Sequence, residues 1–444
     1  MQNKINKLSL AISVGLAASV LSAPAIASGF QVREQSAKAL ANAWSGSAAG
    51  AEDAGFMVYN PAAIGNIDGT QFVSSISYID ASFELKDGQA SNGPITYTSG
   101  ASGKGGQNAW VPSFAVKTQL NEKLDLGLAI YSPYGLSTKY DEDWIGRYHG
   151  IETELKTIDI QPTLNYRATD RLSLAVGLRA EYADATLSQA VDFGTLAAMQ
   201  GSPFATPGQN DVIAEVTGDD WGYGYTLGAL FQATERTRLG VGYRSEIELT
   251  LDGEVDYSGT DPVSQGGVAM GAVSDGGGSA DLTTPANLNF GVYHQLTDRL
   301  ALMANAEWTE WSSFDELAIE FDDGTSSTTH ENWNNTWAFS VGANYALNDR
   351  WLLRAGLGYD ETPVPDSSHR TPRVPDSDRR WVSVGATFTP TEHLDITAGY
   401  LHVFADDVDM DLDASDPGNA RGGNLSGEYE VSADVLALSA SYRF

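Results

Sequence analysis

Hydrophobic and polar residues alternate through most of the chain, in runs of roughly ten residues that begin near Thr70. In residues 124–131, leucine and isoleucine occupy the even positions, and Asp, Gly, Ala and Tyr occupy the odd ones. Residues 172–179 and 351–360 show the same pattern. A period of two is typical of a β-strand, because successive side chains point to opposite faces. The pattern therefore predicts an all-β protein built from amphipathic strands.

The aromatic residues distinguish two ways of assembling such strands. In a soluble sandwich the apolar faces cover a core, whereas in an outer-membrane barrel they face lipid and small or polar residues line the lumen. Trp351 and Tyr359 stand at opposite ends of one apolar face, and Trp337 and Tyr345 do so on the preceding strand. Such pairs are typical of the aromatic girdles at the two membrane surfaces, so they favour the barrel.

Six short polar triplets of one type separate the alternating runs. Each consists of Asn or Thr, then an acid, then a base or His, and they occupy residues 121–123, 169–171, 234–236, 297–299, 348–350 and 391–393. The intervals between them hold two strands and a longer loop, and short turns opposite long loops are typical of outer-membrane barrels. Six turns join twelve strands, and one further strand at each end gives a 14-stranded antiparallel transmembrane β-barrel over residues 70–444.

The two ends of the chain carry targeting features. Lys4 and Lys7 precede an apolar stretch, and an A-x-A site at residues 25–27 completes a secretory signal peptide over residues 1–27. The apolar stretch is shorter than the about 20 residues that a transmembrane helix needs, and no later run is long enough either. The last strand ends in Tyr442 and Phe444, which resembles the signal read by the barrel assembly machinery. We therefore expect localisation in the bacterial outer membrane, in contact with its lipid and lipopolysaccharide.

Composition excludes several other functions. The net charge is −32, with 58 acidic against 26 basic residues, so nucleic acid is not the expected partner. A hydrophobic content of 42% argues against global disorder. The chain has no cysteine and only six scattered histidines, and it lacks H-E-x-x-H, Walker A and G-x-S-x-G motifs. We therefore expect no enzyme activity, no cofactor and no resident metal.

One acidic series near the end of the chain needs separate treatment. Asp407, Asp409, Asp411 and Asp413 alternate with apolar residues, but an EF-hand would need glycine where Leu412 stands. The motif fails again at its final position, which is a glycine instead of glutamate. We interpret the series as an acidic, solvated last loop, with calcium bridging to lipopolysaccharide phosphates as the alternative.

Residues 28–69 do not alternate and differ in composition from the rest of the chain. They are rich in Gly, Ala and Ser, with Gln35 to Trp44 readable as a short helix and Asn60-Pro61 as a turn. A barrel of fourteen strands would leave an open channel unless something filled it. We therefore interpret this segment as a hatch inside the lumen, and a flexible periplasmic tail is the alternative.

Several motifs, read together, resemble the FadL-type long-chain fatty acid transporters, and the resemblance covers essentially the whole mature chain. In the hatch they include Gly29-Phe30-Gln31, Ala43-Trp44-Ser45-Gly46 and Asn60-Pro61-Ala62. In the barrel they include Tyr134-Gly135-Leu136, Trp221-Gly222-Tyr223-Gly224, Tyr243-Arg244-Ser245-Glu246, Glu307-Trp308, Thr362-Pro363-Val364-Pro365-Asp366 and Pro375-Asp376-Ser377-Asp378-Arg379-Arg380-Trp381. The resemblance implies a fourteen-strand barrel with an N-terminal hatch. It also implies ligand capture between long extracellular loops, binding near the mature N-terminus and lateral exit through a kinked third strand.

Each implied stage has candidate residues. The longest loops should span about residues 185–220 and 250–284, and they carry apolar residues that we interpret as a capture surface: Phe193, Leu196, Met199, Phe204 and Met270. A loop packed on itself explains these residues equally well, and the helices that relatives carry in these loops are not readable here. The kink is expected at Pro133 and Gly135, because proline cannot donate to a strand ladder. The alternative is that the strand simply ends there.

A lipid carboxylate would need a cation in a dry pocket, and three arginines point inward by alternation. They are Arg179, Arg244 and Arg354. Arg179 shares its face with Glu181, and Arg244 with Glu246, so mutual ion pairing is the alternative to ligand binding. If Arg244→Ala leaves fatty acid affinity unchanged in the purified protein, Arg244 is not an anchor.

The sequence therefore predicts a passive outer-membrane transporter for hydrophobic small molecules, with long-chain fatty acids as the first candidate. Uptake of aromatic or aliphatic hydrocarbons by the same fold is the alternative. A general porin would show a large steady conductance, and a structural surface protein would have no use for a hatch.

Overall fold

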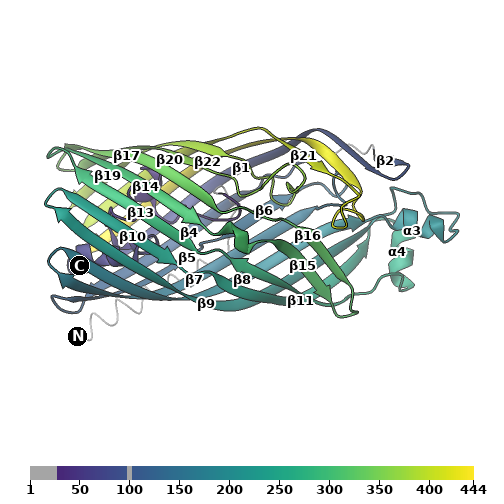
Figure 1. The fold of residues 1–444 in the computed structure, drawn as a ribbon, viewed down its shortest axis with the longest axis horizontal. Coiled ribbons are helices and arrows are strands. Elements are labelled where there is room, and N and C mark those ends of the chain that lie inside the picture. Colours follow the sequence, from purple (N-terminus) through teal and green to yellow (C-terminus); the bar gives the residue numbers. More distant parts are fainter. Residues whose placement is uncertain (1–27, 98–102) are drawn as a thin grey trace.

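The structure is a computed structural model that describes residues 28–97 and 103–444. The expected signal peptide, residues 1–27, lies outside the described residues. Figure 1 shows one closed barrel with short turns at one end and long loops at the other. No helix in the described ranges is both long and apolar enough to cross a membrane.

Twenty-two strand segments form the barrel wall and its extracellular extensions. The first half of the chain contributes β1 Thr70–Asn92, β2 Ile95–Tyr97, β3 Gly103–Lys104, β4 Asn108–Gln119, β5 Leu124–Tyr131, β6 Gly135–Lys139, β7 Glu152–Thr169, β8 Leu172–Val191, β9 Val212–Thr234, β10 Thr237–Arg244 and β11 Ile247–Gly259. The second half contributes β12 Gly276–Thr284, β13 Asn287–Gln295, β14 Leu300–Thr309, β15 Glu316–Phe321, β16 Ser326–His330, β17 Thr336–Asn348, β18 Trp351–Asp360, β19 Arg379–Thr391, β20 Leu394–Ala405, β21 Val408–Leu412 and β22 Asn424–Arg443.

These segments make fourteen wall strands because six of the strands are interrupted. The interrupted strands are β5–β6, β10–β11, β12–β13, β14–β15, β16–β17 and β20–β21, and β2 and β3 are short additions beside β1. Each wall strand pairs antiparallel with its neighbour in the chain, and β1 pairs with β22 from Gln71↔Arg443 to Ser91↔Asn424. This last pairing closes the barrel and leaves no open edge, which a strand protein in lipid requires. The prediction of a 14-stranded antiparallel barrel is confirmed.

All six polar triplets form the short turns between strands. In the turn after β4, Asn121 Oδ1 accepts hydrogen bonds from the backbone N–H of Lys123 and of Leu124. Asn348 caps the turn before β18 in the same way. The first residue of each triplet therefore closes the turn with its side chain, which explains why Asn or Thr recurs there.

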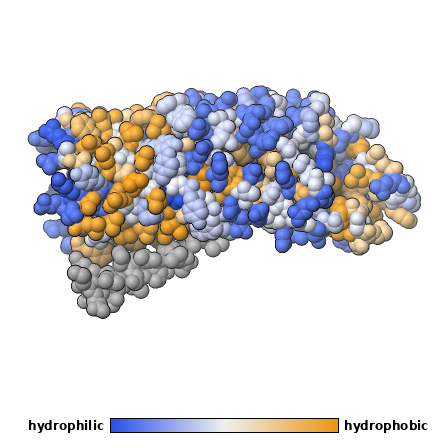
Figure 2. All heavy atoms as spheres, turned by 60° about the horizontal axis from the view of Figure 1, so that its bottom comes forward, coloured by the Kyte–Doolittle hydropathy of each residue, from blue (hydrophilic) through white to orange (hydrophobic). Residues whose placement is uncertain are grey.

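The outer wall carries an apolar belt near the end with the short turns. Four residues on the outer face are each more than half exposed: Leu178, Val341, Leu357 and Leu436. On the opposite face of the same strands, four residues are buried inside the barrel: Arg179, Ala338, Arg354 and Val435. Figure 2 shows this belt, with a polar surface beyond it. Trp351 and Tyr345 are exposed at one border of the belt and Trp337 at the other. The apolar faces therefore have no protein partner and are solvated by membrane lipid.

Residues 28–69 fill the lumen as a compact hatch. Its helical turns are α2 Ala37–Leu40, η1 Ala54–Val58 and η2 Pro61–Asn66, each begun by a side-chain cap from Ser36, Asp53 or Asn60. Small residues allow it to approach the wall closely: a Cβ at Gly240 would lie 1.9 Å from the carbonyl oxygen of Ala48. Glycines in the wall strands therefore leave room for the backbone of the hatch.

Two expectations about local structure, the length of the hatch helix and the length of the two longest loops, are wrong. The helix expected over Gln35 to Trp44 has only the four residues of α2, because Ala43 and Trp44 adopt left-handed backbone angles, with φ of 55° and 57°. The third and fourth extracellular loops are shorter than expected, because β8, β9 and β11 continue far beyond the membrane belt. Both loops also contain a helix that the sequence did not reveal, α3 Phe193–Met199 and α4 Pro262–Ala269.

The acidic series is partly a strand. Asp409 and Asp411 are exposed on β21, while Met410 and Leu412 between them are buried against β22. Within the described part of the chain, no group of three or more His, Asp or Glu residues could hold a metal ion. The alternation of acidic and apolar residues therefore reflects a strand with one solvent-exposed face and one buried face.

Candidate functional site

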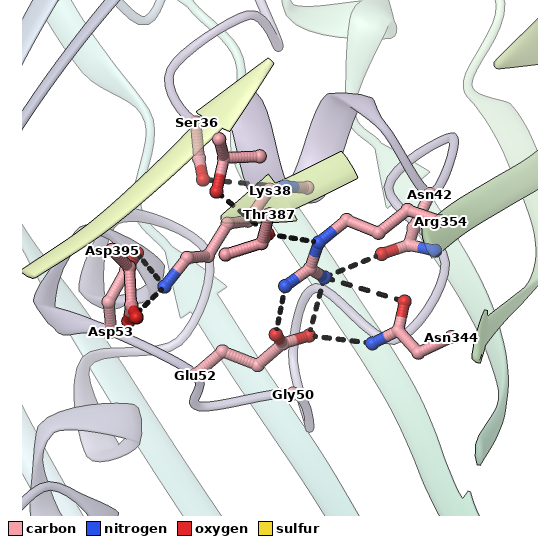
Figure 3. Close-up of polar contacts among 12 residues, drawn as sticks. Ser36, Lys38, Asn42, Gly50, Glu52, Asp53, Asn344, Arg354, Thr387 and Asp395 are labelled. Carbon is pink, nitrogen blue, oxygen red and sulfur yellow. Dashed lines mark hydrogen bonds and ion pairs between the residues drawn. The ribbon is translucent and has the colours of Figure 1, made fainter. Parts of the chain in front are cut away.

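The hatch is held to the wall by buried ion pairs. Arg354 on β18 pairs with Glu52 of the hatch at 2.5 Å, and Lys38 pairs with Asp53 and with Asp395 of β20 at 3.0 and 3.5 Å (Figure 3). Each of these buried cations therefore has at least one acidic partner, as a buried charge requires.

A second ionic group lies higher in the lumen. Arg33 of the hatch pairs with Glu307 of β14 at 3.0 Å and with Asp360 of β18 at 2.7 Å. Both partners come from wall strands far from the hatch in sequence. The hatch is therefore fixed at several points of its length rather than hanging as a tail.

An apolar cavity of about 80 Å³ lies above the hatch. Phe30 of the hatch belongs to its lining, together with wall and loop residues Leu136, Leu155, Leu187, Val216, Leu251, Leu282, Phe314, Leu317, Ile319 and Val374. Four charged residues also line it: Glu154, Asp281, Glu331 and Arg373. An apolar lining with a few polar groups is typical of a site for a small lipophilic ligand.

Aromatic rings surround Phe30 at the floor of the cavity. Its ring contacts Trp311, Phe314 and Trp333 at centroid distances of 4.7, 5.3 and 5.8 Å, and Tyr134 at 5.9 Å. These four partners come from the interrupted strands, so the floor depends on those interruptions.

Gly29 sits directly below this aromatic floor. It has φ of +59°, and a Cβ there would meet Trp333 at 2.6 Å and Trp311 at 2.8 Å. Only glycine therefore fits beneath these rings.

The third wall strand is interrupted between β5 and β6, at residues 132–134. β4 pairs with β5 only as far as Phe114↔Ile130, so no regular ladder joins β4 to the third wall strand above that point. The hatch fills the place: the N–H of Val32 donates to the carbonyl of Pro133, and the N–H of Gly135 donates to the carbonyl of Phe30, both at 2.9 Å. The same hatch segment therefore forms part of the cavity floor and closes the interruption at Pro133 and Gly135.

Gln35 of the hatch bridges the two sides of this interruption. Its side-chain amide donates to the carbonyl of Ser132 at 2.5 Å, and its own carbonyl accepts from the Ser113 hydroxyl on β4. Movement of the hatch near residues 30–35 would therefore open the wall and the cavity floor together.

The Asn60-Pro61-Ala62 motif of the hatch has a structural role. Asn60 caps η2 by accepting from the N–H of Ala62 at 3.0 Å, and its amide donates to Ala48 and to Ala229 of β9. Pro61 takes the first helical position, where its missing N–H costs nothing. The Asn-Pro-Ala element therefore anchors the lower hatch to the wall.

None of the three arginines expected to bind a carboxylate lines the cavity. Arg179 is fully buried and pairs with Asp159 at 2.5 Å and with Glu181 at 2.6 Å, the pairing considered as the alternative above. Arg354 is occupied by Glu52. Both cations are neutralised within the protein.

Arg244 has a different environment. Its Nη2 donates to the carbonyl of Val58 at 3.3 Å, and its guanidinium lies 5.7 Å from the Tyr131 ring, next to the third-strand interruption. Its Nη1 is buried without a hydrogen-bond partner, and no ion pair is formed by Arg244 among the described residues. Glu246 lies at the break between β10 and β11 and is exposed, so the pairing with Arg244 that was the alternative to ligand binding is not formed.

Arg373 is the cavity cation that sequence reasoning missed. It lies in the loop between β18 and β19 and donates to neutral groups only: the carbonyl of Glu152, the Thr153 hydroxyl and the side-chain oxygen of Gln189. Within the described chain it has no ion-pair partner, and burial lowers the pKa of its guanidinium to about 10. It also lines a neighbouring polar cavity of about 170 Å³ together with His149. An anion placed beside Arg373 would offset the cost of burying its charge, which the electrostatic attraction to Glu331 offsets only in part.

Glu331 is one of three acidic residues that line the cavity. Its carboxylate accepts from the Trp333 indole N–H at 3.1 Å, and burial raises its pKa to about 7 despite the indole and Arg373. The carboxyl is therefore readily protonated near neutral pH.

The expected capture residues cluster at the extracellular tip. Met199, Phe204 and Met270 are 82, 78 and 84% exposed, and Leu196 is about half exposed. Phe193 instead packs against Gly267, which joins α3 to α4. The two loops thus present one apolar surface, of a kind that often marks a binding site.

Comparison with known proteins places the chain in a family. Residues 18–444 match the family described as outer membrane protein transport protein (OMPP1/FadL/TodX). A long-chain fatty acid transport protein of Escherichia coli O6:H1 is 31% identical, over 89% of this chain and 91% of the relative. Outer membrane protein P1 of Haemophilus influenzae is 29% identical over 90% of both chains.

Solved structures agree in fold. The crystal structure of a Pseudomonas aeruginosa FadL homologue matches with a TM-score of 0.84 at 28% identity, covering 94% of this chain and all of the homologue. The Pseudomonas putida toluene transporter TodX matches with a TM-score of 0.66 at 18% identity, covering 88% of this chain and 94% of that one. The chain therefore belongs to the FadL family of outer-membrane transporters for hydrophobic compounds.

Proposed function

We propose that the protein takes up long-chain fatty acids passively across the outer membrane. The observation that carries this proposal is the position of Arg373, a cation without an ion-pair partner among the described residues, in the wall of a largely apolar cavity. A hydrocarbon would leave that cation unpaired, whereas a fatty acid offers an apolar tail to the cavity and a carboxylate to the guanidinium. The relatives named as long-chain fatty acid transport proteins support the same choice.

The route has three stages. The tail first adsorbs to the apolar tip of α3 and α4, and it then enters the cavity with its carboxylate at Arg373. Displacement of Phe30 and Gln35 opens the third-strand interruption, through which the chain leaves sideways into the membrane. Arg244, which has an unpartnered Nη1 beside Tyr131 at that interruption, receives the carboxylate on the way out.

Arg373→Met tests the choice of substrate. We expect it to weaken oleate binding by about 2 kcal/mol, or roughly thirtyfold, because a charge-assisted hydrogen bond is lost. Binding of oleyl alcohol, which has a similar tail and no charge, should stay within about twofold. Titration calorimetry of the purified protein in detergent measures both. Arg380→Met is the matched control, because Arg380 is exposed on the outer wall and pairs with Asp406.

The hydrocarbon alternative makes the opposite prediction. The toluene transporters among the structural relatives have the same fold, so fold does not decide between substrates. Saturable binding of toluene, with oleate binding that is weak and unaffected by Arg373→Met, would contradict the fatty acid proposal.

A further inference from the structure

The barrel wall has a second gap in its ladder, between the eighth and ninth strands. β13 pairs with β14 up to Asn287↔Thr309, and β12 pairs with β15 only from Gly278↔Phe321 to Ala280↔Ile319. Between these two ladders, one strand contributes nine residues, 310–318, and the other contributes only six, 281–286. No register pair joins the two segments. We call the place between residues 281–285 and 311–318 the side port.

Backbone groups on both edges of the side port are unable to bond across it or have other partners. Pro285 has no N–H to donate, and its carbonyl accepts from the Tyr134 hydroxyl at 2.7 Å inside the lumen. On the other edge, the N–H of Phe314 bonds within its own segment, to the carbonyl of Trp311. Five residues at about 3.3 Å each give a gap roughly 16 Å long, ample for an extended acyl chain.

The side port leads directly into the apolar cavity. Asp281 and Leu282 on one edge, and Phe314 and Leu317 on the other, belong to the cavity lining. A tail that entered here would therefore reach the space beside Arg373 without passing the extracellular loops.

The side port opens at the outer surface of the membrane. Trp308 of β14 and Trp337 of β17 are register partners on the lipid face, directly below the point where both strands are interrupted. Tryptophan at this place marks the level of the lipid headgroups. Figure 2 shows an apolar area on the wall beyond the belt, enclosed by polar residues.

We propose that the side port is a second entrance, through which single-tailed anionic amphiphiles lying in the outer leaflet slide their tails into the cavity. This inference rests on the proposed function, because it uses the same cavity and the same cation. It assigns to the extracellular loops the capture of ligand from solution and to the wall the capture of ligand from the membrane. The headgroup stays at the polar rim until the tail is inside, and then reaches Arg373.

The absence of cysteine allows single thiols to be placed at the port. Thr283→Cys and Ala318→Cys lie on its two edges, each next to a leucine that lines the cavity, and are modified with a bulky polar maleimide. Glu215→Cys is the matched control, because Glu215 is exposed on β9, where the ladder with β8 is unbroken at Ser188↔Glu215. The probe is a diazirine-bearing stearate dissolved in the lipid of nanodiscs that contain the full chain.

Cross-links to cavity residues are counted over time by mass spectrometry. We expect the label at either port edge to slow their appearance about tenfold and to leave the final yield unchanged, because an entrance controls rate and not affinity. The labelled control should match the unlabelled protein. Equal rates for port-labelled and control protein would overturn the second entrance alone. Absence of cavity cross-links in every sample, including unlabelled protein, would overturn the proposed function as well.

Discussion

At the residue scale, the cavity lining combines one cation, Arg373, with three acids, Glu154, Asp281 and Glu331, of which Glu331 titrates near neutrality. Arg373 carries its charge throughout the physiological range, since burial lowers its pKa only to about 10. Glu331, with a pKa raised to about 7 by burial, is ionised above that pH and protonated below it. The net charge felt by an anionic headgroup therefore becomes more positive as pH falls through 7.

This arrangement predicts that anion binding tightens on acidification. Hexadecyl sulfonate is a suitable probe because its headgroup stays ionised, and we expect its affinity to rise about fivefold from pH 8 to pH 6. Calorimetric titration at both pH values measures the change. Glu331→Gln should bind at both pH values as the native protein binds at pH 6. An unchanged pH profile in that variant would show that another group is responsible.

At the element scale, an element could be predicted from the sequence when the contacts that form it lie within the same short stretch of chain. The six turns were readable because each is closed by its own Asn or Thr, as Asn121 and Asn348 illustrate. The interruptions at residues 310–315 and 331–335 were not readable, because they depend on how hatch residue Phe30 packs against the wall.

The candidate site was less predictable than the barrel. Alternation placed Arg179 and Arg354 in the lumen correctly, but their partners Asp159 and Glu52 come from a neighbouring strand and from the hatch. Arg373 lies in an irregular loop where alternation says nothing. The available signal was its position immediately before the Pro375 to Trp381 motif, in a proline-rich loop that the barrel mouth holds in place.

The helices α3 and α4 give a prediction at the same scale. Replacing Met199, Phe204 and Met270 by Ser removes exposed apolar surface and no buried contact, so folding should be unaffected. We expect uptake of albumin-bound oleate by cells producing this variant to fall several-fold at low concentration and to recover at high concentration, because only capture is weakened. Glu248→Ser, Glu254→Ser and Asp256→Ser, on the exposed face of β11, provide a control of equal size. Loss of uptake at all ligand concentrations would contradict a role limited to capture.

At the scale of the whole molecule, the barrel and the hatch have separate tasks. The wall closes through its own ladder, β22 to β1, without any hatch residue. The hatch supplies Phe30 to the cavity floor and closes the third-strand interruption. The lumen without it would be a wide polar channel lined by Glu307, Arg354 and Asp360.

Deletion of residues 28–66 should therefore convert a transporter into a pore. We expect the shortened chain to assemble in the outer membrane, to lose saturable oleate uptake and to show a large steady conductance in planar bilayers. The full chain should conduct little. Retained oleate uptake by the shortened chain, or equal conductance of the two proteins, would contradict the assignment of the hatch as the plug and the cavity floor.

The central claim is that one apolar cavity beside Arg373 holds the tail of a fatty acid during transport. Crystals of the protein grown with 16-bromohexadecanoate test this directly, because anomalous scattering locates the bromine without ambiguity. The account predicts bromine within the cavity lined by Leu155, Leu251 and Leu282, and a carboxylate within hydrogen-bond distance of Arg373. Bromine found only on the outer belt or at the loop tip, with an empty cavity, would contradict it.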